Sequence, residues 1–351
     1  MIPIFDGHND FLLRLVNAPG RREALWRTGT TEGHIDLPRL RQSGFAGGFF
    51  AVWVPSIEPE VIVPPPNSAA TAGPLKRPLP PEVPYETAAA FAAKAIGQLR
   101  WMERQGGLKV VTSVAEIRDC MANGTIAAIL HFEGAEAISQ DLDTLDVWHS
   151  AGLRSLGPVW SRPTAFGHGV PFDFPSSPDT GPGLTEAGKA LVKKCNALKI
   201  MLDLSHLNER GFWDVAEIST QPLVATHSNA HAITPASRNL TDQQLEAIAA
   251  SDGMVGLNYA TGFLAADGLQ TPFAGWEPYY RHLDHLIEKI GEDRVGLGSD
   301  FDGATMSADM RDVMGNPRLL EALSAHGYSD ELIEKLAYRN WLAVLERTWG
   351  G

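Results

Sequence analysis

The stretch IFDGHNDFLL, residues 4–13, decides how the fold of this chain is interpreted. It begins as an apolar run that should form a buried first strand, yet it places His8, Asn9 and Asp10 in a row. Residues two apart on a strand face the same side, so His8 and Asp10 can both point inward and bind one ion from a rigid edge. Taken alone this pattern is weak, because many histidines at strand ends only satisfy backbone groups. Its meaning therefore depends on how the other strands end.

Apolar runs short enough to be strands recur along the chain, and each is followed by a segment with helical periodicity. We count eight such runs, at residues 2–6, 46–54, 126–132, 153–159, 200–204, 223–226, 254–259 and 295–298. The helical segments include residues 86–105, 184–199, 241–251 and 282–291, with closing helices expected at 330–349. This alternation predicts an α/β fold, a (β/α)8 barrel of the TIM type. The alternative is an open doubly wound sheet, but nothing in the sequence resembles its glycine-rich dinucleotide turn.

The length of 351 residues suits either two average domains or one large barrel. We interpret residues 1–351 as a single barrel domain. Residues 55–84 fit neither strand nor helix, because they are rich in proline and aperiodic. This stretch falls between the second strand and its helix, so we expect a long surface loop near the barrel mouth.

The composition limits the kinds of partner that the chain can have. A formal net charge of −13 argues against nucleic acid or an anionic membrane surface, because both attract basic patches. Cys120 and Cys195 are the only cysteines, so a metal site would have to use histidine and carboxylate. We find no charged leader and no apolar run long enough to cross a bilayer. We therefore expect a cytoplasmic protein without a membrane or nucleic-acid partner.

Polar residues suitable as metal ligands follow five of the eight predicted strands, where a barrel of this type gathers its chemistry. They are His8 and Asp10, Glu133, His206, His227, and the pair Asp300 and Asp302. Imidazole and carboxylate without thiolate suit zinc, with manganese and iron as alternatives. Five ligands are too many for one tetrahedral ion that also holds water, but they suit two ions if one carboxylate, most naturally Glu133, bridges them. Two such ions can share a hydroxide and polarise a substrate carbonyl.

Other polar residues have simpler interpretations. We expect His131 to be a core residue and Asp302 to make a turn with Gly303. Arg154 is interpreted as a structural partner. The remaining histidines on loops and helical stretches are expected to be solvated: His231, His282, His285 and His326.

Several motifs together resemble the membrane dipeptidases, also called renal dipeptidases, and their bacterial relatives. The motifs are DGHND at 6–10, DLPRLRQSGFAGGFFAVWVP at 36–55, HFEGAEAI at 131–138, DLSHLNERGFWDV at 203–215, VATHSNAHAI at 224–233, ASRNLTDQQL at 236–245 and GLGSDFDG at 296–303. The resemblance runs along nearly the whole chain. It implies a barrel of the metal-dependent hydrolase type with two zinc ions.

The resemblance also implies a role for each site residue. His8, Asp10 and Glu133 would hold one ion, and Glu133, His206 and His227 the other. Asp300 matches the family's acid/base aspartate, and Arg238 matches the arginine that meets the terminal carboxylate of the substrate. The expected reaction is hydrolysis of a dipeptide by a metal-bridging hydroxide, with tolerance of a D-residue at the C-terminal position. A homodimer is left open.

The sequence departs from the family after the fourth predicted strand. Mammalian members carry a substrate-contacting histidine there, whereas this chain has Trp160. His168 follows between two glycines, so the backbone can bend there without steric cost. We therefore hypothesise that Trp160 forms a wall of the substrate pocket and that His168 supplies the polar contact.

Three alternatives to a dipeptidase stay open from the sequence. A related binuclear amidohydrolase acting on N-acyl amino acids, lactones or β-lactams would keep the metals and alter the loops. A metal-dependent sugar isomerase shares the barrel and the ligand types, but it would not need a carboxylate clamp such as Arg238. A non-catalytic binding protein would have lost a ligand, and this sequence has lost none.

Overall fold

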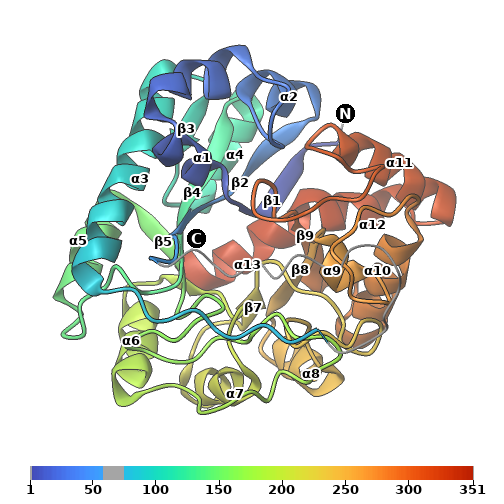
Figure 1. The fold of residues 1–351 in the computed structure, drawn as a ribbon. Coiled ribbons are helices and arrows are strands. Elements are labelled where there is room, and N and C mark those ends of the chain that lie inside the picture. The colour runs from blue at the N-terminus through green and yellow to red at the C-terminus, as the bar shows by residue number, and fades with distance from the viewer. Residues whose placement is uncertain (1, 58–74, 351) are drawn as a thin grey trace.

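A computed structural model describes residues 2–57 and 75–350 of the chain. Its strands gather at the centre and its helices surround them (Figure 1). The strands are β1 (Ile4–Asn9), β2 (Phe45–Trp53), β3 (Leu108–Val110), β4 (Ile126–Glu133), β5 (Leu153–Gly157), β6 (Met201–Leu202), β7 (Val224–Ala225), β8 (Met254–Asn258) and β9 (Val295–Gly298).

The strands run parallel and form a nearly closed barrel. The order of hydrogen-bonded neighbours is β6-β5-β4-β2-β1-β9-β8-β7. The two ends of this path meet, because Asp203 pairs with Val224 and the Leu204 N–H donates to the Val224 carbonyl at 2.8 Å. β3 lies outside the barrel path and pairs with the first half of β4. The fold is therefore the TIM barrel that the sequence predicts.

The helices lie outside the strands, and polar caps fix where many of them begin. Thr241 opens α8 with a capping box, in which its side chain and that of Gln244 each meet the other's backbone. Ser113, Thr185 and Asn208 cap α4, α6 and α7 in the same position. The α-helices are α1 (Phe11–Asn17), α2 (Leu37–Gln42), α3 (Tyr85–Gln105), α4 (Val114–Asn123), α5 (Asp143–Ala151), α6 (Glu186–Ala197), α7 (Glu209–Ile218), α8 (Asp242–Ala250), α9 (Thr261–Leu264), α10 (Glu277–Ile290), α11 (Gly315–His326), α12 (Asp330–Glu334) and α13 (Asn340–Trp349).

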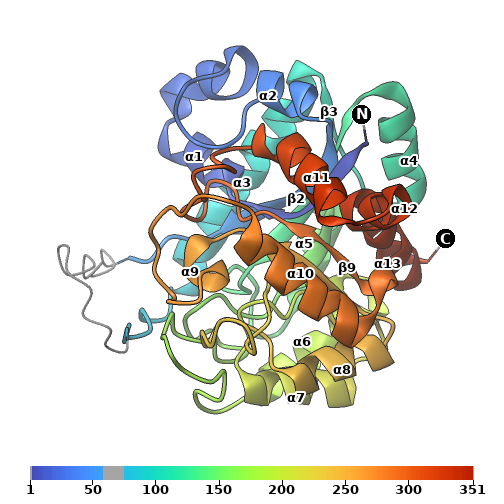
Figure 2. The ribbon, with the colours of Figure 1, turned by 90° about the vertical axis from the view of Figure 1, so that its right-hand side faces the viewer.

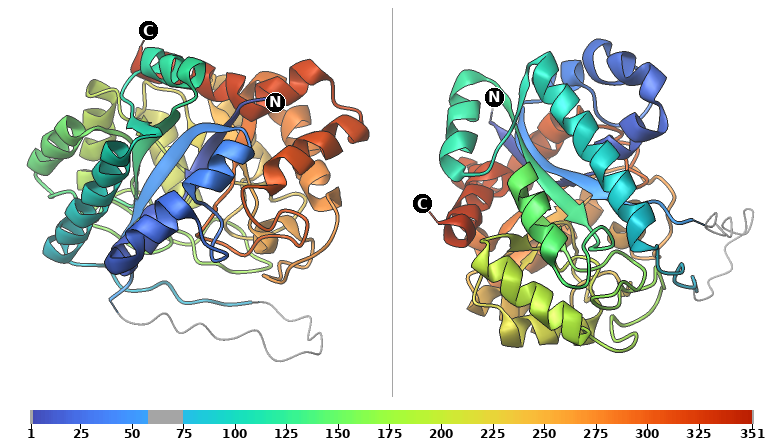
Figure 3. Two further views of the ribbon diagram at one scale, coloured as in Figure 1. Left: turned by 90° about the horizontal axis from the view of Figure 1, so that it is seen from above. Right: turned by 90° about the vertical axis from the view of Figure 1, so that its left-hand side faces the viewer.

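Shorter helical turns complete the outer layer: 3-10 turns at η1 (Pro19–Arg21) and η3 (Glu292–Arg294), and π-helical turns at η2 (Ala24–Thr28) and η4 (Lys335–Arg339). The helices α10, α11 and α12 cover one side of the molecule (Figure 2). The long helix α3, drawn in cyan, packs along the outside of the sheet (Figure 3).

Trp341 of α13 closes the end of the barrel at which the strands begin. The side chain is fully buried, and its indole N–H donates to the Leu297 carbonyl at 3.0 Å. Glycines leave room for the ring: a Cβ at Gly7 would lie 2.6 Å from it, and one at Gly256 would lie 2.9 Å from it. Since this end is filled, the chemistry is confined to the opposite end.

The eight strands expected from the sequence are all present, and their boundaries shift by a few residues. β1 continues as far as Asn9, so His8 belongs to the strand rather than to the turn after it. β3 was not anticipated, because three residues carry too little pattern. Of the proline-rich stretch expected as a loop at 55–84, residues 58–74 lie outside the described part. The described residues on either side of that gap form no helix or strand.

We expect Trp341→Ala to destabilise the fold by about 3–5 kcal/mol, because it leaves a cavity inside the barrel and an unpaired buried carbonyl. The exposed Trp213 of α7, with a relative exposure of 37%, provides the matched control. Trp213→Ala should cost less than about 1 kcal/mol. Urea unfolding of both variants measures the difference, and equal losses would show that Trp341 does not support the barrel.

Candidate metal centre

The residues predicted as metal ligands meet at the carboxyl end of the barrel. His8 lies near the end of β1, and Glu133 is the last residue of β4. Asp10, His206 and His227 follow β1, β6 and β7 within a few residues. All five are buried, with relative exposures between 0% and 6%. Parallel strands end at one rim, which is why residues 219 positions apart, from 8 to 227, come together.

Glu133 stands between two groups of imidazoles. Its Oε1 lies 2.8 Å from Nε2 of His206 and 3.5 Å from Nε2 of His227. Its Oε2 lies 3.5 Å from Nε2 of His8, whose Nε2 is also 3.5 Å from Oδ2 of Asp10. Each carboxylate oxygen therefore faces a different set of ligand atoms, as a bridging carboxylate requires.

The contacts among these atoms fit a metal site better than a hydrogen-bonded core. Both ring nitrogens of His8 and Oδ1 of Asp10 are buried, and none of them has a hydrogen-bond partner among residues 2–57 and 75–350. The Nε2 atoms of His206 and His227 face one another at 3.2 Å. Buried polar atoms are normally paired, so these donors and acceptors are suited to hold a cation.

Hydroxyl groups behind the histidines fix their orientation. Nδ1 of His206 lies 2.9 Å from Oγ of Ser161, and Nδ1 of His227 lies 2.8 Å from Oγ1 of Thr226. In each ring Nδ1 is hydrogen-bonded to a hydroxyl group, so Nε2 is the atom that faces Glu133. Partners of this kind set the tautomer of metal-binding histidines.

The protonation of the cluster also suits metal binding. Burial, followed by the positive charges of Arg238 and His8, holds the pKa of His206 and His227 well below the usual histidine range. Both rings are therefore neutral and able to ligate. Burial raises the pKa of Glu133 to about 7. Burial also lowers the pKa of His8, but the carboxylates beside it, Glu133 first, outweigh that effect and raise it well above its ordinary value. Protons and a cation thus compete for the same atoms.

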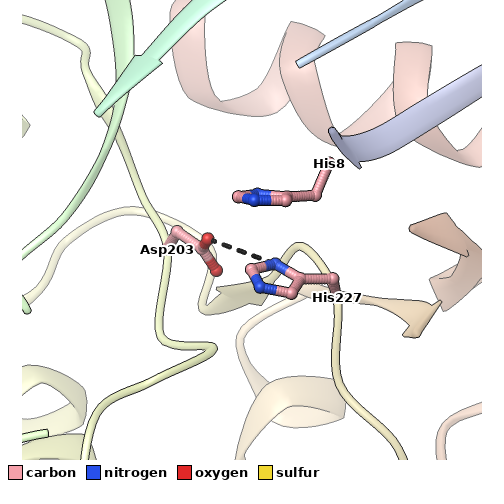
Figure 4. A group of neighbouring side chains, drawn as sticks. All are labelled: His8, Asp203 and His227. Atoms are coloured by element: carbon pink, nitrogen blue, oxygen red, sulfur yellow. Dashed lines mark ion pairs between the residues drawn. The ribbon is translucent and has the colours of Figure 1, made fainter. Parts of the chain in front are cut away.

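Asp203 is a site residue that strand-end reasoning missed. Its side chain accepts hydrogen bonds from the Ser205 hydroxyl at 2.6 Å and the Thr226 hydroxyl at 2.6 Å. It faces Nδ1 of His227 at 3.9 Å, while the ring of His8 stacks on that of His227 at 3.8 Å (Figure 4). Because Asp203 lies on the side of His227 away from Glu133, we interpret it as orienting that ring. In the sequence, the position of Asp203 three residues before His206 is the one feature that could have indicated its role.

His131 lies beside this group and is fully buried, as expected for a core residue. Its Nδ1 is 2.9 Å from the hydroxyl of Ser155, and its Nε2 is 3.5 Å from Oδ2 of Asp203. The expectation that His282 is solvated is wrong. His282 is fully buried, and its Nδ1 accepts a hydrogen bond from the backbone N–H of Ala230 at 3.1 Å. A helical position alone does not reveal which face of the helix is covered.

Asp300 lies in a tight turn after β9, close to His8 and Asp10. Its backbone has φ of 60°, and its N–H donates to the His8 carbonyl at 3.0 Å. The amide of Asn258 donates to its Oδ2 at 2.9 Å. Burial raises the pKa of the Asp300 carboxyl. A carboxyl group held in this way is suited to taking up and returning a proton.

Asp302 braces the same turn. It also has positive φ, 67°, and its Oδ1 accepts the backbone N–H of His34 at 2.7 Å. In return, its own backbone N–H donates to Nδ1 of His34 at 2.8 Å, and Arg14 pairs with the carboxylate at 3.3 Å. A Cβ at the following Gly303 would collide with Asp10. The turn expected of Asp302 and Gly303 is therefore anchored to a distant loop.

A cavity of about 390 Å³ opens above the cluster. Its lining includes the polar residues Asp10, Glu133, His206 and Asp300 and the aromatic residues Trp53, Trp160, Phe172 and Phe263. The ring of Trp160 lies 5.2 Å from that of Trp53 and 5.5 Å from that of Phe172. Trp160 is thus a member of an aromatic wall, and its ring lies 5.9 Å from that of His206.

Arg238 is buried beside the site rather than on the cavity surface. One terminal nitrogen donates to the Ser228 hydroxyl at 2.7 Å and the other to the His227 carbonyl at 2.9 Å. Its Nε has no hydrogen-bond partner in the described part of the chain. Burial lowers its pKa to about 10, so the group remains cationic at neutral pH. The guanidinium lies 5.8 Å from the centre of the Phe263 ring, which lines the cavity.

His168 is not brought to the cluster. Its Nδ1 lies 3.2 Å from the Gly183 carbonyl, and its side chain is not among those that line the cavity. The polar contact that Trp160 cannot supply is thus not provided by His168 in this structure.

A TIM barrel that gathers imidazoles and carboxylates at its rim, with a carboxylate between them, is typical of metal-dependent enzymes. The family model "Membrane dipeptidase (Peptidase family M19)" matches residues 1–349, and the chain belongs to this family. It is accordingly a metallopeptidase with dipeptidase activity, and its buried histidine and carboxylate groups are suited to hold the metal.

Two solved structures are similar over almost the whole chain. One, a dipeptidase described as a metallopeptidase of family M19, is 58% identical, with a TM-score of 0.94 and coverage of 100% of this chain and 99% of the other. The second is a metallopeptidase from Rhodobacter sphaeroides, also 58% identical, with a TM-score of 0.95 and coverage of 99% of each chain. It is liganded with a phosphinate mimic of the dipeptide L-Ala-D-Ala. An uncharacterized protein in the pqqA 5' region of Klebsiella pneumoniae is 49% identical over 70% of this chain and 90% of its own length.

Among residues 2–57 and 75–350, no helix combines the length and the apolar character needed to cross a bilayer.

We expect two divalent ions per chain in the metal-loaded protein and fewer in Glu133→Gln, because the substitution removes the charge that lets two cations lie side by side. Elemental analysis after dialysis measures this. Glu186→Gln, on a side chain that is 90% exposed at the start of α6, is the matched control and should retain both ions. One ion in the native protein, or two retained in Glu133→Gln, would contradict the bridge.

Proposed function

We propose that this protein hydrolyses dipeptides that carry a free C-terminal carboxylate, with two zinc ions held by His8, Asp10, Glu133, His206 and His227. The observation that supports it most directly is Glu133, whose two oxygens face separate ligand sets under a cavity of about 390 Å³. Manganese or iron would suit the same donors. We further propose that residues 1–351 act as one catalytic domain, because strands from β1 to β9 contribute to one rim.

When bound, two divalent ions would supply an activated water and polarise the scissile carbonyl. The chain's own contribution begins with Asp300. Its carboxyl lines the cavity, its pKa is raised by burial, and Asn258 fixes one of its oxygens. We propose that Asp300 accepts a proton from the attacking water and passes it to the leaving amine.

Arg238 would define the length of the substrate. Its buried guanidinium is held by the His227 carbonyl and the Ser228 hydroxyl, next to Phe263 in the cavity wall. A carboxylate paired with this group would lie at a fixed distance from Glu133 and the metals. Only substrates with one residue after the scissile bond would fit, which gives the exopeptidase limit that a dipeptidase shares.

The stereochemistry of the substrate is the finer part of the proposal. The relative from Rhodobacter sphaeroides binds a mimic of L-Ala-D-Ala. At 58% identity and a TM-score of 0.95, we propose that this chain likewise accepts a D-residue at the C-terminal position. The test is a panel of dipeptides with L- or D-residues at that position, alongside N-acyl amino acids, a lactone and a β-lactam. If the enzyme hydrolyses only the N-acyl amino acids, the lactone or the β-lactam, the proposed dipeptide substrate is refuted, and a related amidohydrolase activity takes its place.

For Asp300→Asn we expect a fall in kcat of roughly 10² to 10⁴, the usual contribution of a positioned acid/base group, with both metals retained. Asparagine can still accept the hydrogen bond from Asn258, so the turn should keep its shape. Steady-state kinetics and metal analysis on the same sample decide the matter. Near-native kcat would refute the role, and loss of a metal would make Asp300 a ligand instead.

For Arg238→Met we expect a lower kcat/KM on a dipeptide, because a buried charge pair with the substrate carboxylate is lost. The decrease should correspond to about 2–5 kcal/mol of lost transition-state stabilisation. The C-terminal amide of the same dipeptide, which cannot form that pair, should be affected much less. Arg281→Met, on the exposed face of α10, is the control. An equal loss on acid and amide would rule out the clamp.

A further inference from the structure

A short segment places one arginine over the cavity. Residues 75–84 run across the front of the molecule in Figure 1, from the foot of α3 towards α8. Leu75 pairs with Phe174 through an antiparallel bridge. The backbone N–H of Arg77 donates to Oδ1 of Asp173 at 2.7 Å, and Lys76 pairs with Oδ2 of Asp173 at 3.0 Å. Asp173 is itself buried, so it fixes the backbone from which the Arg77 side chain extends.

The side chain of Arg77 reaches the cavity without a strong partner of its own. It lines the cavity together with Gln270, whose Oε1 accepts a hydrogen bond from Nη2 at 3.4 Å. No ion pair joins Arg77 to a carboxylate of residues 2–57 or 75–350, although Lys76 beside it has one. Most of the donors of this guanidinium are therefore available to a ligand.

Arg77 is the only cationic side chain among the described residues that line the cavity. Four carboxylates line it as well: Asp10, Glu133, Asp300 and Asp302. The chain as a whole carries a net charge of −13, which disfavours an anionic substrate at long range. A local guanidinium in such a setting would alter which substrates bind rather than how fast they arrive.

The position of Arg77 relative to Arg238 indicates which part of the substrate it meets. Phe263 lines the cavity and lies 5.8 Å from the Arg238 guanidinium. A smaller recess next to the cavity is lined by Arg77, Gln270 and the same Phe263. Both arginines thus lie near the same aromatic residue of the cavity wall. If Arg238 holds the terminal carboxylate, a side chain on that same residue would lie in the part of the cavity that Arg77 lines.

We propose that Arg77, assisted by Gln270, is a specificity-determining residue that favours dipeptides with an acidic side chain, aspartate or glutamate, at the C-terminal position. This inference rests on the proposed dipeptidase function. The carboxylate of the substrate side chain accepts two hydrogen bonds from the guanidinium, an arrangement that an amide side chain of the same shape cannot reproduce with equal strength.

The test compares alanyl-aspartate, alanyl-asparagine and alanyl-alanine, each with the C-terminal enantiomer that the metal-loaded enzyme hydrolyses faster. The wild-type protein should favour alanyl-aspartate over alanyl-asparagine by roughly tenfold or more in kcat/KM. Arg77→Met should lose about 10- to 100-fold on alanyl-aspartate and change by less than about threefold on the other two substrates. Arg281→Met, the exposed control, should retain the wild-type order of preference.

The possible failures differ from one another. If the wild type does not prefer aspartate to asparagine, the role of Arg77 is refuted while dipeptidase activity stands. If Arg77→Met loses equally on all three dipeptides but not on their C-terminal amides, Arg77 meets the terminal carboxylate and the side-chain role is refuted. If the metal-loaded wild type hydrolyses none of the dipeptides, the proposed function fails and this inference fails with it.

Discussion

The carboxylate of Glu133, held between two groups of imidazoles, is the interaction on which the site depends. A buried carboxylate next to three buried histidines is costly unless cations or protons compensate for the charge. Two features reflect that cost: the raised pKa of Glu133, and the ring nitrogens of His8, which have no hydrogen-bond partner among the described residues. Two divalent ions would relieve it, since each oxygen then has a positive partner. The remainder of the rim is arranged to keep Glu133 in this position.

Support for the ligands comes from hydrogen bonds that cross the barrel. Asp203, after β6, holds Thr226 and lies beside His227, after β7. Asp6 of β1 accepts hydrogen bonds from the backbone and the hydroxyl of Ser299 at 2.7 and 2.9 Å, just before Asp300. Neighbouring strands are thus joined at their carboxyl ends, where the sheet hydrogen bonds stop. These contacts restrict the ligands to one geometry, which catalysis by positioned groups requires.

The two ends of the barrel have opposite roles for a physical reason. At the end where the strands begin, Trp341 and glycines such as Gly7 and Gly256 pack closely and exclude water. At the other end, loops of different lengths leave a cavity lined by Trp160 and other aromatic rings. Packing supplies stability at one end, and loop variation supplies specificity at the other. Arg77 belongs to the second kind of feature, because it enters from a segment outside the barrel.

The sequence by itself determined the barrel and the convergence of His8, Asp10, Glu133, His206 and His227 at its rim, because strand periodicity is local and parallel strands end at a common rim. It could not reveal contacts between residues far apart in the chain. Arg14 pairs with Asp302 across 288 positions. His282 is buried although we expected it to be solvated, and the side chain of His168 is not among those that line the cavity it was expected to enter. The hydrogen bond between Arg77 and Gln270 could not be predicted from the sequence either. Such pairings arise from the path of loops and the packing of helices, and no periodicity in the chain encodes them, so only the tertiary structure decided them.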